Sequence, residues 1–177
     1  MQSVANKPTA LRGRSLPDVI GLGGGVAGLL AGAVMVILSP ILSWLNGITL
    51  WEPPRLIAAT VLGSSSVSST DFALQPVVIG LIVHMITSLV LGIIFGIVLN
   101  RVLHLTTDFG LPIYVGLSYG LIVFFVAYFI LLPFLNPTLR ENYIPSLVAQ
   151  NVIFGMCLGI FYTLLRPKPY TNTIEPQ

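Results

Sequence analysis

The chain has 177 residues, of which 55% are hydrophobic and only 8% are charged, and its formal net charge is +2. Soluble domains carry about 25% charged residues, so this composition excludes a protein whose whole surface faces water. The small net charge also excludes binding of nucleic acid through a basic patch. The composition therefore indicates an integral membrane protein.

Four stretches without a charged residue follow one another along the chain, at about 20–44, 77–98, 111–132 and 145–165. Helices of about 20 residues, at about 1.5 Å per residue, span a hydrocarbon core of about 30 Å. In lipid, only helices and closed β-barrels satisfy all backbone hydrogen bonds. The four stretches lack the polar alternation of barrel strands, so they are helices. We predict an all-α, polytopic membrane protein with four transmembrane helices.

Polar segments flank these helices. We predict that residues 1–19 form a polar N-terminal arm and that residues 166–177 form a C-terminal tail. Four spans place both segments and the 101–110 loop on one side, and six of the eight basic residues lie there. The positive-inside rule then predicts that both termini are cytoplasmic, in the inner (plasma) membrane of a prokaryotic cell.

The longest connection, 45–76, contains the segment "WEPPRLIAATVLG". Pro53 and Pro54 suit a first helical turn, and Gly63 suits the residue after a helix end. The segment is too short to span the bilayer. We therefore predict a short helix at the membrane interface, with Trp44 and Trp51 as anchors.

Small residues recur four apart in every predicted span, which places them on one ridge of each helix. Such ridges let helix backbones approach closely in lipid, where no hydrophobic force drives helices together. The predicted packing positions are Gly24, Gly28, Gly32, Ser88, Gly92, Gly96, Gly116, Gly120, Gly155 and Gly159.

The same residues indicate two similar hairpins in the same orientation. Gly24 and Gly28 match Gly116 and Gly120, and Pro40 matches Pro133. The polar residues then align His84 with Asn151. Coincidence among common residue types is the competing interpretation.

His84 stands at the head of the second ridge, inside a charge-free span. The simplest interpretation is a polar contact between His84 and Asn151, worth about 0.6–2 kcal/mol in membranes. A haem or chlorophyll ligand and a proton relay are the alternatives. His104 lies twenty residues away, about 30 Å along a helix, so the two histidines cannot bind one iron.

The spans hold no Asp, Glu, Lys or Arg, and the chain has no P-loop, GxSxG elbow, dinucleotide fingerprint or metal-ligand spacing. We expect no enzymatic activity and no required cofactor or metal, although a lipid, quinone, pigment or haem shared with a partner subunit stays open. The third span is rich in rings that suit contact with lipid, a subunit or such a ligand: Tyr114, Tyr119, Phe124, Phe125, Tyr128 and Phe129.

The segments "GGVAGLLAGAVM", "PPRLIAATVLG", "HMITSLVLGIIFG", "GLSYGL" and "NVIFGMCLGIFY" resemble a group of small prokaryotic four-helix membrane proteins of unknown function. Some members carry transporter or oxidase-subunit names. The resemblance covers roughly residues 20–165 and supplies no catalytic residues. It implies an accessory subunit of a larger membrane complex, in respiratory or photosynthetic electron transfer, that contacts lipids and other integral membrane subunits. The alternative is a small oligomeric transporter or channel with His84 and Asn151 lining the path.

Overall fold

The computed structural model describes residues 22–63, 72–103, 110–135, 137 and 144–165. Within these residues, four helices are long and apolar enough to cross a membrane, which confirms the predicted all-α membrane fold. They are α1 (Leu22–Leu45), α3 (Leu74–Ile97), α4 continued by η3 and α5 (Leu111–Leu135), and α7 (Ile144–Leu165). The predicted arm at 1–19 and tail at 166–177 lie outside the described residues.

Two of these helices contain a stretch of wider π-helix. α3 continues as η2 (Val98–Val102), and α4 (Leu111–Val126) passes through η3 (Ala127–Leu131) into α5 (Leu132–Leu135). Pro133 has no N–H, and its ring displaces the carbonyl four residues earlier, on Phe129. α1 also contains an internal proline, Pro40, and stays α-helical, so the proline alone does not account for η3.

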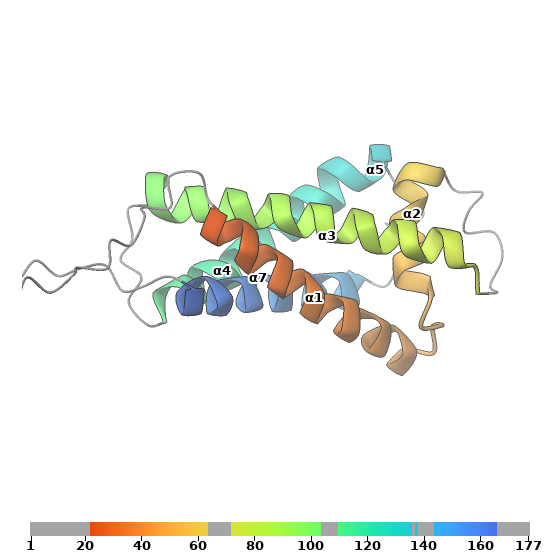
Figure 1. The fold of residues 1–177 in the computed structure, drawn as a ribbon. Helices are drawn as coiled ribbons and strands as arrows, with labels where there is room; N and C mark the ends of the chain where they lie inside the picture. Colours follow the sequence, from red (N-terminus) through yellow and green to blue (C-terminus); the bar gives the residue numbers. More distant parts are fainter. Residues whose placement is uncertain (1–21, 64–71, 104–109, 136, 138–143, 166–177) are drawn as a thin grey trace, which may run out of the picture.

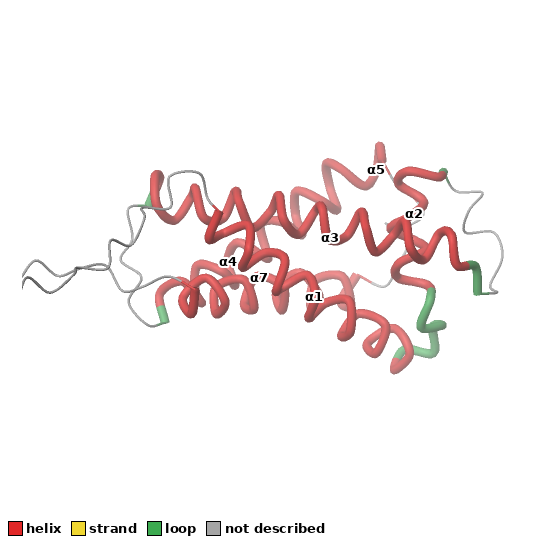
Figure 2. Tube along the Cα trace, in the orientation of Figure 1, coloured by secondary structure: helices red, strands yellow, loops and turns green. Residues whose placement is uncertain are grey.

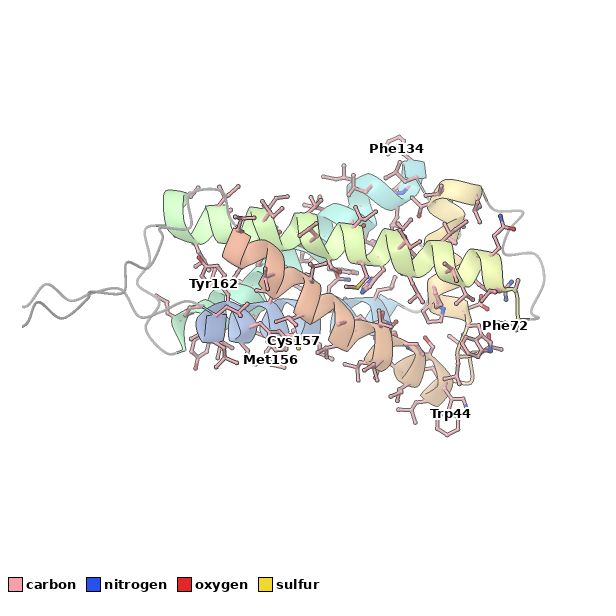
Figure 3. The ribbon with its side chains drawn as sticks, viewed as in Figure 1. Trp44, Phe72, Phe134, Met156, Cys157 and Tyr162 are labelled. Atoms are coloured by element: carbon pink, nitrogen blue, oxygen red, sulfur yellow. The ribbon has the colours of Figure 1, made fainter. Side chains whose placement is uncertain are left out.

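The short helix α2 (Glu52–Leu62) lies across one end of the bundle (Figures 1 and 2). Its bounds confirm the predicted short helix, with prolines in the first turn and Gly63 after the end at φ 81°. It packs against α3 and α1, and the Pro54 carbonyl rests on Gly80. Trp44 is 64% exposed and points away from the bundle (Figure 3). The interfacial position of α2 stays a prediction.

The four long helices form two antiparallel pairs, α1 with α3 and α4 with α7, and α1 also packs along α7 (Figure 1). The core lies where these helices meet. It consists of small and large apolar side chains: Ala27, Ala31, Met35, Phe95, Leu99, Phe154, Leu158 and Tyr162. The alanines on α1 leave room for the rings of the other helices.

Large apolar side chains cover the outside of every span, including Ile37, Ile82, Ile122 and Leu164, each more than half exposed. In water such a surface would be very unfavourable. In a bilayer these side chains contact lipid tails, and the helices are held together by close packing between small residues.

Candidate functional site

The small-residue ridges form two backbone contacts of the same kind. On α1, Gly24 and Gly28 face Gly92 of α3, and a Cβ added at Gly28 would lie 2.8 Å from the Gly92 Cα. On α4, Gly116 and Gly120 face Gly155 of α7. The remaining predicted packing positions lie at the same two interfaces: Gly32, Ser88, Gly96 and Gly159.

These contacts define how the two hairpins correspond. Gly28 rests on the Ser88 carbonyl, and Gly120 rests on the Asn151 carbonyl. Asn151 therefore corresponds to Ser88 in the packing. The polar residues of the sequence had aligned Asn151 with His84, one helical turn away.

The predicted contact between His84 and Asn151 is not formed. Each side chain instead has a main-chain partner. His84 Nε2 lies 3.2 Å from the Gly32 carbonyl oxygen of α1. Asn151 Nδ2 donates to the Leu147 carbonyl at 2.8 Å, within α7. His84 thus links α3 to α1, and both side chains line one cavity.

This cavity, which we call the main cavity, has a volume of about 290 Å³ and lies between α3 and the α4–η3–α5 segment. Its position follows from an unequal packing of the hairpins. α1 packs closely along α7, whereas the equivalent pair, α3 and α4, has few close backbone approaches. The widened turn of η3 contributes Ala127, Tyr128 and Leu131 to the wall. π-Turns of this kind are frequent at functional sites.

Exposure distinguishes the mouth of the main cavity from its floor. Thr60, Thr87, Leu131 and Leu135 line it and are exposed. Four other lining residues are buried, namely Met35, Ser88, Phe124 and Phe154. The cavity therefore opens sideways between α3 and η3–α5, beside α2, on the outer surface of the bundle.

Three polar side chains of intermediate exposure, His84, Gln150 and Asn151, also line the main cavity, and we call them its polar wall. Gln150 connects helices, because its Oε1 accepts from Ser39 Oγ of α1 at 2.9 Å and its Nε2 donates to Ser146 Oγ at 3.1 Å. His84 and Gln150 also line a smaller cavity of about 70 Å³ beneath α2. The two cavities thus meet at the polar wall.

Three aromatic side chains fill the bundle on the opposite side from α2. Phe95 packs against Tyr119 at 5.3 Å and against Tyr162 at 5.7 Å between ring centroids. The Tyr119 hydroxyl donates to the Leu91 carbonyl at 2.9 Å, which joins α4 to α3. Of the rings in the third span, Tyr119 and Phe124 thus turn inward, whereas Tyr114, Phe125 and Phe129 are exposed.

In the polar wall, only one ring nitrogen of His84 could bind the metal of a cofactor. Because His84 Nε2 is engaged by Gly32, a haem or chlorophyll metal would have to bind through Nδ1. Sequence reasoning found His84 and Asn151, missed Gln150 and Ser39, and singled out Tyr119 for its ring but not for its hydrogen bond. Their polar atoms were visible signals, but only the packing of distant helices brings their partners within reach.

Comparisons with family models, with curated proteins and with solved structures find no match to this chain. The resemblance to small prokaryotic four-helix membrane proteins stays a prediction.

Proposed function

We propose that this protein is a non-catalytic accessory subunit of a larger membrane complex and that it holds an amphipathic molecule in the main cavity. The observation that carries the proposal is the sideways opening of this cavity between α3 and η3–α5. Ligand pockets are mostly apolar with a few well-placed polar groups. The main cavity has this character, and a lipid-like molecule would enter it directly from the bilayer.

Exposed aromatic rings on α4 and η3 support the proposed contact with a partner subunit. Phe125 and Phe129 stack at 5.9 Å and are 50% and 58% exposed. Phe134 of α5 is 85% exposed and points outward (Figure 3). Aromatic side chains are enriched at protein interfaces. Assignment of the complex to respiratory or photosynthetic electron transfer in a prokaryotic inner membrane, with cytoplasmic termini, rests on the family resemblance and on the charge distribution.

Cavity filling tests the bound molecule. In native mass spectrometry, the full chain is released from native-lipid nanodiscs, and the mass of any molecule that stays bound to it is measured. Ala127→Trp places a large ring in the main cavity, whereas the matched variant Ala33→Trp places it on an exposed side of α1. We expect a retained molecule in wild type and Ala33→Trp and its loss in Ala127→Trp. Equal retention in all three proteins would contradict the proposal.

Photocrosslinking in intact membranes tests the partner. A photoreactive amino acid at Phe129 is expected to capture another integral membrane protein in a fixed ratio. The same group at Ile82, an exposed residue of α3, is the matched control for non-specific capture. Capture of lipid alone, or only of a second copy of this chain, would overturn the subunit role.

A small oligomeric transporter or channel is the second candidate, because His84 and Asn151 line one cavity and His84 extends into the next. Liposomes that contain the protein and a pH-sensitive dye test this candidate. It requires proton or solute flux above that of empty liposomes, and loss of that flux in His84→Ala.

A further inference from the structure

We propose that the main cavity selects an amphipathic molecule whose headgroup is an uncharged hydroxyl, as in long-chain or isoprenoid alcohols. The inference rests on the proposed function, since it names the chemistry of the molecule that the cavity holds. It follows from the charges, the hydrogen-bond donors and acceptors, and the shape of the cavity wall.

Charge excludes the common ionic headgroups. Among the described residues that line the main cavity there is no Asp, Glu, Lys or Arg. A phosphate, carboxylate or ammonium group in this apolar setting would find no opposite charge on these lining residues, and burying an unpaired charge is very unfavourable. The headgroup that the wall accommodates is therefore neutral.

His84 presents a hydrogen-bond acceptor to the cavity region. A carbonyl oxygen only accepts, so the 3.2 Å contact with Gly32 requires that His84 Nε2 carry a proton. Among the described residues, no carboxylate lines either of the two cavities to compensate an imidazolium. In the neutral ring, Nδ1 is then a bare acceptor. Nδ1 can accept a hydrogen bond, and a ketone, quinone or ether cannot donate one.

Asn151 presents the complementary groups. Its contact with the Leu147 carbonyl fixes the amide orientation and uses one of the two N–H bonds of Nδ2. The second N–H and the Oδ1 atom remain for another partner. A hydroxyl group both donates and accepts, so it can donate to His84 Nδ1 and accept from Asn151 Nδ2. An acceptor-only headgroup would satisfy Asn151 alone.

The apolar part of the wall suits a hydrocarbon chain. Phe124 and Phe154 form the floor, and the exposed side chains of Leu131 and Leu135 stand at the mouth. A volume of about 290 Å³ is at the lower end for small-molecule pockets, about 300–1,000 Å³. It suits a headgroup and the first part of one chain, so the remaining tail would extend through the mouth into the lipid.

Binding of a matched ligand series to the full chain in nanodiscs tests the inference. The probes are a twenty-carbon isoprenoid alcohol, its methyl ether and its phosphate ester, each titrated and weighed as a complex by native mass spectrometry. We expect the alcohol to bind about three- to tenfold more tightly than the ether, the change produced by one neutral hydrogen bond. The phosphate ester should bind more weakly than the alcohol.

His84→Phe locates the headgroup. This variant keeps a ring at the site but has no acceptor nitrogen, so the alcohol should lose its advantage over the ether. If this variant does not fold, the wild-type comparison of alcohol with ether still decides the inference. A preference for the alcohol that persists in folded His84→Phe would overturn the assigned position of the headgroup.

The remaining outcomes separate the inference from the proposed function. Saturable and equal binding of alcohol and ether, abolished by Ala127→Trp, would overturn the hydroxyl headgroup and leave the binding function intact. Tighter binding of the phosphate ester would overturn the charge argument alone. Absence of saturable binding for all three probes, together with no molecule retained from native lipid, would overturn both.

Discussion

Ser88 and Asn151 occupy equivalent positions in the two hairpins, because the carbonyl of each is covered by a glycine of the preceding long helix, Gly28 and Gly120 respectively. Both side chains also line the main cavity. Each hairpin thus contributes a polar group at the same helical position to one cavity. Many membrane transport proteins place their binding sites between structural repeats, so a cavity between two similar hairpins is where we expect a bound molecule.

The first prediction concerns the glycine contacts. Gly28→Ala and Gly120→Ala each add a Cβ against a backbone, so the paired helices must separate. We expect each variant to lower the free energy of unfolding in mild detergent by about 1–3 kcal/mol. Ala33→Leu, on an exposed side of α1, is the control and should change it little. Unaltered stability in both glycine variants would mean that the helices are not in such close contact.

The second prediction concerns the attachment of α2. Because the Pro54 carbonyl rests on Gly80, Gly80→Ala should displace α2 from α3. Hydrogen exchange measures this displacement: the amides of residues 55–62 should exchange about tenfold faster or more, while those of α7 keep their rates. Ile82→Ala alters an exposed side chain of the same helix and should leave α2 protected. Unchanged exchange in Gly80→Ala would contradict this contact.

Sequence reasoning reached the helices, the ends of α2 and the residues that form the small ridges, because hydropathy, proline and glycine act locally. It failed on the partner of His84. The ridges repeat every four residues, so a hairpin alignment that is shifted by one turn still matches small residues with small residues. Asn151 could therefore be aligned with His84 or with Ser88, and only the packing of Gly120 on Asn151 decides.

The presence of the main cavity could not be predicted from the sequence either. The cavity exists because α1 packs closely against α7, whereas α3 has few close backbone approaches to α4. The residues of these helix pairs are far apart in the chain. The composition of the third span indicated many rings but not which of them turn inward. Phe124 is 5% exposed and its neighbour Phe125 is 50% exposed, a distinction that depends on the rotation of α4 against α7.

The third prediction concerns one of the hydrogen bonds that join the two hairpins, between Tyr119 of α4 and Leu91 of α3. Tyr119→Phe removes the hydroxyl that donates to Leu91 and keeps the ring against Phe95. We expect a loss of about 0.6–2 kcal/mol in the free energy of unfolding, the range for hydrogen bonds between membrane helices. Tyr114→Phe, at a residue that is 72% exposed, should be neutral. Equal stability of the two variants would contradict a structural role for the Tyr119 hydroxyl.

The last prediction concerns the π-turn. Pro40 follows Gly24 by sixteen residues, whereas Pro133 follows Gly116 by seventeen, and η3 lies within the longer interval. A π-helical bond spans five residues instead of four, so η3 accommodates the additional residue. Deletion of Ile130, an exposed residue of η3, should therefore convert η3 into regular α-helix and preserve the packing of α4 on α7.

Deletion of Ile122 is the matched control, because it removes a similarly exposed isoleucine from the regular part of α4. It rotates the following residues by about 100° and carries Phe124 out of the core, which should cost about 3 kcal/mol or more. Thermal unfolding in detergent measures both variants. The Ile130 deletion should remain folded but lose the molecule retained in the main cavity, since a narrower helix reshapes its wall. Equal damage from both deletions would show that η3 does not accommodate an additional residue.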